Sequence, residues 1–127
     1  MSTNSEELMV CAESMAKIAN NDAEFRAVCS RAYYAAFIGA REFHAALATP
    51  GSVGNANGTH QQLIAQLLAP GISAKNKKHA TSKALGKSLI PLLKTRVDAD
   101  YKIGLDFDKV TADTTVANSR TTVDASK

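Results

Sequence analysis

The sequence of 127 residues predicts an all-α protein, an up-and-down bundle of about four to five helices formed by one domain, residues 1–127. Apolar residues recur every three or four positions along the chain, and no segment alternates with a period of two. Hydrophobic residues make up 45% and charged residues 21% of the chain, which is typical of a globular domain. A chain of this length is also long enough to bury a core of its own.

The first predicted helix begins at an N-terminal capping signal and ends near residue 18. Two residue pairs have the spacing of a capping box, Asn4 with Glu7 and Thr3 with Glu6. Apolar side chains follow at intervals of three or four residues and predict one stripe that faces the core. This stripe consists of Leu8, Cys11, Met15 and Ile18.

The second predicted helix runs from about Ala23 to Leu47, after a capping segment at residues 20–22. Its many alanines allow a neighbouring helix to pack closely against it. Cys29 lies within its apolar pattern, and we expect both Cys29 and Cys11 to be ordinary core residues. The next segment, residues 49–58, contains four Gly or Pro residues and is predicted to be a mobile loop.

Three more helices are predicted in the second half of the chain. Thr59 and Gln62 have the spacing of a capping box at the start of the third, which ends at residues 70–71. Residues 75–79 are predicted to be an exposed loop, and the fourth helix to begin at residue 81 or 82, with a kink at Pro91. The fifth helix spans residues 109–125, with Val110, Val116 and Val123 facing inward.

Positive charge is concentrated between residues 75 and 97, where seven of the 15 basic residues occur without a single acidic one. A block of this kind attracts phosphate groups or an acidic partner, with an affinity that falls as salt rises. The simpler alternative is a solvated helix face next to a loop. The candidate anion-binding residues in this block are Lys75, Lys77, Lys78, Lys83 and Lys87.

Several classes of protein do not fit the sequence. The three histidines are far apart, and no metal-ligand spacing or phosphate-cradling or dinucleotide-binding glycine motif is present, so we expect no metal and no cofactor. No apolar run approaches the roughly 20 residues of a membrane span. The N-terminus lacks the features of a signal peptide, and two cysteines make no disulfide scaffold. We therefore expect a cytoplasmic protein.

Two groups of residues are candidates for chemistry. In the second predicted helix, Arg31 and Tyr34 belong to an aromatic run that is continued by Arg41 and His44. The simpler interpretation is that the aromatic side chains of this run fill the core, with the tyrosine hydroxyls bonded at its edge. Arg41 and His44 are three residues apart and would share a surface patch.

The second group lies at the end of the fourth predicted helix. Arg96 and Asp100 are four residues apart, so a helix would bring them close enough to form an ion pair. Tyr101 follows Arg96 by five residues, which places it roughly 140° around the helix from the arginine. The two side chains are therefore not expected to share a face. One interpretation is an Arg–Asp pair beside a buried tyrosine, and the other is an arginine that holds a phosphate at a helix end.

Several short motifs occur in order between about residues 23 and 101. They are Arg31-Ala32-Tyr33-Tyr34-Ala35-Ala36-Phe37, Thr59-His60, Leu85-Gly86, Leu92-Leu93 and Arg96-x-Asp98-Ala99-Asp100-Tyr101. Taken together, these motifs resemble the HEPN family of small helical bundles, and the late motif is most similar to the branch that reads Arg…Ala-Asp-Tyr.

The resemblance implies a bundle that usually forms a homodimer. Many members of the family are metal-independent ribonucleases that act as toxins or in antiviral defence, and others are paired with a small nucleotidyltransferase. In the nuclease members an arginine stabilises the charge on the phosphate, and a histidine four to six residues later moves protons. By this likeness Arg96, Asp100 and Tyr101 are candidate catalytic residues. The five lysines from Lys75 to Lys87, called the lysine block below, are then an RNA-facing arm.

This chain carries Tyr101 where the nuclease members carry the histidine. An ordinary phenol, with a pKa near 10, is a poor proton acceptor at pH 7. Beside the plain possibility of a helical adaptor whose dimer surface is its only function, two hypotheses therefore stay open. The first is a toxin-like or defence protein that acts on RNA, with Arg96 as phosphate clamp and a proton carrier from elsewhere, for which His60 and His79 are the candidates. The second is a non-catalytic module that binds a nucleotide or a partner nucleotidyltransferase, with Tyr101 as a target of nucleotide transfer.

Overall fold

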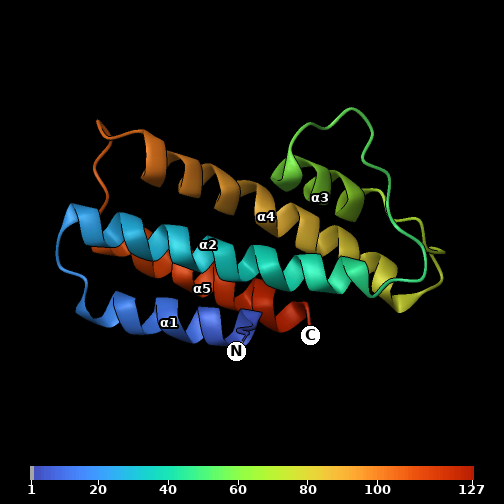
Figure 1. Cartoon of the computed structure of the whole chain (residues 1–127), viewed down its shortest axis with the longest axis horizontal. Helices are drawn as coiled ribbons and strands as arrows, with labels where there is room; N and C mark the ends of the chain where they lie inside the picture. Colours follow the sequence, from blue (N-terminus) through green and yellow to red (C-terminus); the bar gives the residue numbers. More distant parts are fainter. Residues whose placement is uncertain (1) are drawn as a thin grey trace.

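The computed structural model describes residues 2–127, which form five α-helices and no strand and so confirm the predicted all-α bundle. Four long helices alternate in direction along the bundle, and a short helix lies against one of them (Figure 1). The two chain ends lie near each other, where Lys127 Nζ is 2.6 Å from Glu6 Oε1. The helices are α1 (Ser5–Ile18), α2 (Asp22–Ala45), α3 (Thr59–Leu68), α4 (Lys77–Tyr101) and α5 (Lys109–Ala125).

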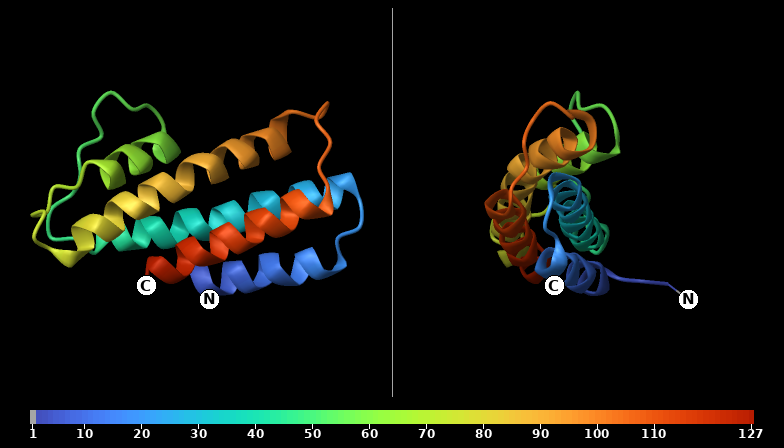
Figure 2. Two further views of the ribbon diagram at one scale, coloured as in Figure 1. Left: turned by 180° about the vertical axis from the view of Figure 1, so that it is seen from behind. Right: turned by 90° about the vertical axis from the view of Figure 1, so that its left-hand side faces the viewer.

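Helix α2 is the central element, because it packs against α1, α4 and α5 (Figure 2). The short helix α3 packs mainly on α4. As the many alanines predict, small side chains fill the inner face of α2, and they are fully buried at Ala32, Ala35, Ala36 and Ala40. Cys29 is buried on the same helix, as predicted. The absence of bulk on this face lets the surrounding helices approach closely.

Side-chain caps define the starts of four helices, α1, α2, α4 and α5. Asn4 Oδ1 accepts a hydrogen bond from Glu7 N at 2.8 Å, and Asn21 Oδ1 accepts one from Glu24 N at 2.9 Å. At α3 the predicted capping box is wrong. Gly58, with φ of +84°, stands at the N-cap and turns the chain into the helix, so no side chain caps its first turn.

Helix α4 begins earlier than predicted, at Lys77 rather than at residue 81 or 82. Asn76 Oδ1 accepts a hydrogen bond from Lys78 N at 2.9 Å, which caps the helix at this earlier position. Residues 77–79 are therefore helical, and the prediction of a loop there is wrong. The helix continues through Pro91 to Tyr101 as one element.

The buried face of α1 lies about one residue away from the predicted stripe. Ser5, Met9, Ala12 and Ala16 are buried, whereas Cys11 and Ile18 are exposed. The small side chains at positions 12 and 16 allow α1 to sit close to α2 and α5, and this close contact decides which face turns inward. The prediction that Cys11 and Ile18 belong to the core is wrong.

Helix α5 has the predicted bounds, but its inner face is more polar than the valine pattern suggests. Val110 is exposed, and Thr115 and Thr122 are buried among apolar side chains. Each threonine hydroxyl donates to the carbonyl four residues earlier, at 2.8 Å and 3.0 Å. Because these hydroxyls are satisfied within the helix, the threonines can be buried at little cost, and Val110 is left outside.

Arg26, on α2, fastens the end of α4 to the bundle. Its guanidinium stacks 4.7 Å from the Phe107 ring and pairs with Asp22 at 2.7 Å. It also donates to backbone carbonyls around the C-terminus of α4 and the loop beyond it. These are the carbonyls of Asp98, Ala99, Lys102, Ile103 and Leu105. One side chain thus fixes the helix end that carries the second group of candidate residues.

Candidate functional site

A pocket of about 260 Å³ opens where α2, the first turn of α3 and the second half of α4 meet. Four residues that the sequence singled out separately line it together: Arg31, Tyr34, His60 and Arg96. The remaining lining residues come from the aromatic run of α2 and its neighbour, namely Ser30, Tyr33 and Phe37. Three segments that are distant in sequence thus form one concave surface.

Arg96 is held by its neighbours at the pocket wall. Its Nε is 2.9 Å from Asp100 Oδ2, which confirms the predicted ion pair, and Ser30 Oγ donates to the same carboxylate oxygen at 3.3 Å. Within residues 2–127, the terminal nitrogens of the guanidinium make no hydrogen bond. Asp100 therefore positions the arginine and leaves its two amino groups free for a ligand.

Tyr101 lies closer to Arg96 than the helical angle predicts. The guanidinium carbon is 5.7 Å from the centre of the Tyr101 ring. The angle of roughly 140° around the helix gives only the direction in which each side chain leaves the backbone. The long Arg96 side chain can reach around the helix end to the Tyr101 ring. Tyr101 is also 68% exposed rather than buried, so the interpretation as a core tyrosine is wrong.

His60 and Tyr33 form a hydrogen-bonded pair beside Arg96. Tyr33 Oη is 2.8 Å from His60 Nδ1, and the imidazole packs against Phe37 with ring centres 4.4 Å apart. Burial, together with the nearby positive charge of Arg96, lowers the pKa of His60. Burial also raises the pKa of the Tyr33 phenol, which therefore stays protonated. The pocket thus contains an imidazole that is neutral near pH 7 next to a guanidinium.

Arg31 and Tyr34 stand at the mouth of the pocket, one helical turn apart. Tyr34 is 42% exposed, and Arg31 is exposed as well, with no ion-pair partner within residues 2–127. Arg41 lies further along α2, with its guanidinium 5.6 Å from the Phe37 ring. The aromatic run is therefore divided between core and surface, because Tyr33 and Phe37 are buried and Tyr34 is not.

His44 does not belong to the pocket. Its Nε2 accepts a hydrogen bond from Gly51 N at 3.1 Å, which ties the loop after α2 to the helix. Burial lowers the pKa of His44, so the ring remains neutral and able to accept this bond near pH 7. His44 is thus a loop anchor, and the predicted patch of Arg41 and His44 is not part of the site.

The lysine block is exposed but does not line the pocket. Lys83 and Lys87 leave α4 roughly 140° and 180° around the helix from Arg96, which places them on its outer face. None of the five candidate lysines from Lys75 to Lys87 makes an ion pair within the described residues 2–127. The block comprises Lys75, Lys77, Lys78, Lys83 and Lys87, and it forms a second positive surface, separate from the pocket.

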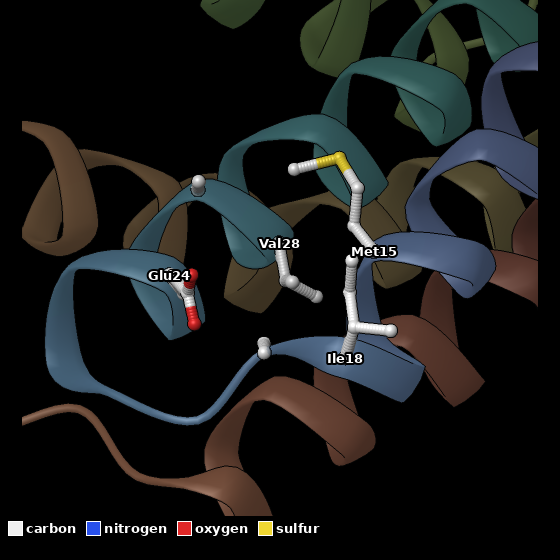
Figure 3. A pocket seen from close by; sticks show the side chains of 6 residues that line it. Met15, Ile18, Glu24 and Val28 are labelled. Carbon is white, nitrogen blue, oxygen red and sulfur yellow. The ribbon is translucent and has the colours of Figure 1, made fainter.

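A smaller pocket of about 110 Å³ lies between the C-terminus of α1 and the start of α2 (Figure 3). Met15, Ile18 and Val28 make it apolar, and Glu24 stands at its edge. The Glu24 carboxylate already has a partner at the start of α2, because its Oε1 accepts a hydrogen bond from Asn20 N at 2.8 Å. This pocket offers no group for chemistry.

Two negative findings concern the part of the chain that the structure describes. Between residues 2 and 127, no group of three His, Cys, Asp or Glu side chains lies close enough to bind a metal ion. Over the same range, no helix has the length and apolarity that crossing a membrane requires.

Comparison with protein-family models, with curated proteins and with solved structures found no significant match to this chain.

The main feature that sequence reasoning missed is the pairing of Tyr33 with His60. The sequence predicts Tyr33 as a core aromatic and His60 only as a candidate. The two residues are 27 positions apart, and a long loop lies between them. No local spacing signals such a contact, because it depends on how α3 packs on α4. Ser30 is a second residue whose role the sequence did not indicate. Its hydroxyl donates a hydrogen bond to the Asp100 carboxylate, which positions Arg96.

Proposed function

We propose that this chain is a HEPN-like protein that binds RNA, with Arg96 as the clamp for one phosphate in the pocket. The observation that carries the proposal is the arrangement of Arg96, whose Nε is paired with Asp100 while its terminal nitrogens face no protein partner within residues 2–127. A guanidinium held in this way is well suited to two parallel hydrogen bonds with phosphate oxygens. The toxin-like or antiviral-defence role follows from the sequence resemblance.

The charge of the pocket supports an anionic ligand. Arg31 and Arg96 contribute two positive charges to its wall, and within residues 2–127 the carboxylate paired with Arg96 is that of Asp100. His60 adds a polar group without charge near pH 7. Aromatic side chains at the same place, Tyr34 above all, offer a surface on which a base can stack.

Metal-independent cleavage of RNA is the further step of this proposal. Arg96 would stabilise the charge that develops on the phosphate, and His60 is the group in the pocket whose proton exchanges nearest to neutral pH. Tyr101 would then have no part in proton transfer. Its ring lies 5.7 Å from the Arg96 guanidinium carbon, and it would contact the bound nucleotide instead.

The lysine block, of which Lys83 and Lys87 lie on the outer face of α4, would add affinity for longer RNA. Since its cations are exposed and unpaired within residues 2–127, its contribution should be electrostatic and should fall steeply with salt. Replacing Lys83 and Lys87 by glutamate should weaken the binding of a 30-nucleotide RNA and reduce its salt dependence. Binding of a trinucleotide, which only fills the pocket, should not change.

A labelled RNA of about 30 nucleotides, incubated with the purified chain in excess chelator, tests the proposal. We expect cleavage on a gel that disappears in Arg96→Ala, and binding by fluorescence anisotropy that is weakened in this variant. Lys109→Ala is the matched control, because Lys109 makes a similar pair with Asp113 on α5, away from the pocket. Equal binding by the wild type and Arg96→Ala would contradict the role of the arginine.

A second candidate function is a non-catalytic module that binds a nucleotide or a partner nucleotidyltransferase. The exposed Tyr101 favours it, because a phenol that is 68% accessible at a helix end is open to nucleotide transfer. Binding without any cleavage in the same assay would favour this candidate. Mass spectrometry of the chain purified from its native host would then show an added nucleotide on Tyr101, absent in Tyr101→Phe.

A further inference from the structure

The hydrogen bond between Tyr33 and His60 can run in either direction, and the direction decides what the imidazole offers to the pocket. If the phenol donates to Nδ1, the proton of the neutral ring is on Nε2. If the ring donates from Nδ1, Nε2 is a bare acceptor. The oxygen and Nδ1 are 2.8 Å apart, which fits both directions.

The surroundings of Tyr33 favour the phenol as donor. Tyr33 is 1% exposed, and His60 Nδ1 is the only hydrogen-bond partner of its hydroxyl within residues 2–127. If the ring donated, the buried hydroxyl proton would have no acceptor. A buried donor without a partner is costly, whereas a phenol oxygen that only donates loses little. Burial also raises the pKa of Tyr33, so that the hydroxyl keeps its proton to donate.

We infer that Tyr33 is a positioning residue that holds neutral His60 with its proton on Nε2, so that His60 donates a hydrogen bond to an oxygen of the bound phosphate. This inference rests on the proposed phosphate site. Nε2 has no hydrogen-bond partner within residues 2–127, and the ring lines the same pocket as Arg96. The pocket then presents donors from two sides, the guanidinium from α4 and the imidazole from α3, to a ligand whose oxygens are all acceptors.

The inference distinguishes His60 from a histidine poised as a general base. A base needs a free lone pair directed at its substrate, and the bond from Tyr33 uses the lone pair of Nδ1 while Nε2 carries the proton. His60 therefore enters as a hydrogen-bond donor, and Tyr33 acts through it without touching the phosphate.

The first test measures the ligand-free chain by NMR. The ¹⁵N shifts of the His60 ring, recorded at about pH 8 where imidazole is neutral, report which nitrogen carries the proton. We expect the Nε2–H form in the wild type and a shift toward a mixture of both forms in Tyr33→Phe. The Nδ1–H form in the wild type would overturn the inference, whatever the chain binds.

The second test compares two substitutions of His60, using as probe an RNA trinucleotide with 2′-O-methyl groups, which cannot be cleaved. The amide nitrogen of glutamine can take the place of Nε2, whereas that of asparagine lies at the place of Nδ1. We expect His60→Gln to bind the probe nearly as well as the wild type, and His60→Asn to lose about tenfold in affinity. Equal losses in both variants would contradict a donor at Nε2.

The two tests separate this inference from the proposed function. If the wild type does not bind the probe but shows the Nε2–H form, the phosphate site is wrong and the role of Tyr33 as a donor stands. If the wild type binds and shows the Nδ1–H form, the phosphate site stands and the inference is wrong.

Discussion

Replacing Arg26 by alanine should destabilise the bundle more than its position near the surface suggests. The side chain is only 11% exposed, and it satisfies five backbone carbonyls at the end of α4 and in the following loop. A hydrogen bond from a charged donor contributes about 1.5–3 kcal/mol, but bonds that share one donor do not add up. We therefore expect the free energy of unfolding to fall by about 3 kcal/mol, a large part of the stability of a domain of this size.

Urea unfolding followed by circular dichroism measures this change, with Arg41→Ala as the control. Arg41 is also on α2, but it is exposed and its described contact is the Phe37 ring at 5.6 Å, so its loss should cost less than about 1 kcal/mol. A decrease below about 1 kcal/mol for Arg26→Ala would refute the reasoning. It would mean that water replaces the guanidinium at these carbonyls without cost.

Three further changes test the packing and the ion pairs. Gly51→Ala should destabilise the chain by about 2 kcal/mol or more in the same urea assay, because the added Cβ would lie 1.9 Å from a carbonyl oxygen of α3. Gly104→Ala is the control and should be nearly neutral, since a Cβ there would enter open space. Ser82→Ala should cost about 1–2 kcal/mol by thermal unfolding, since this fully buried hydroxyl donates at 2.8 Å to a backbone carbonyl of α3. Hydrogen bonds from Arg120 lower the pKa of Glu6 to about 2. The ionised Glu6 carboxylate should therefore stabilise the fold fully above about pH 4.5, and this contribution should disappear as the pH falls toward 2. In Glu6→Gln the free energy of unfolding should no longer show this loss between pH 4.5 and 2. The same loss in the variant as in the wild type would contradict the role of Glu6.

The sequence predicts most of the fold because helix periodicity and caps are local signals. Asn4 and Asn21 cap the helices at the predicted starts, and the fifth helix has the predicted bounds. The errors concern which side of a helix is buried. On α1, bulky Ile18 stays outside while Ala12 packs inside, because the fit between neighbouring helices and not hydrophobicity alone selects the face.

The candidate site was predictable only in parts. Arg96 and Asp100 follow from their spacing, since an ion pair at four residues needs nothing but a helix. The contact of His60 with Tyr33 depends on the return of the chain through a long loop, which no pattern in the sequence describes. The position of the lysines on the outer face of α4 became clear only once the inner face of that helix was known.

Titration of the ¹⁵N-labelled chain with the 2′-O-methyl trinucleotide, followed by NMR, tests the phosphate site most directly. We expect the largest shifts at the side-chain signals of Arg96 and His60 and at the amides of the pocket, and none of these shifts in Arg96→Ala. Shifts confined to the lysine block, or identical shifts in the wild type and in Arg96→Ala, would contradict a phosphate site in this pocket.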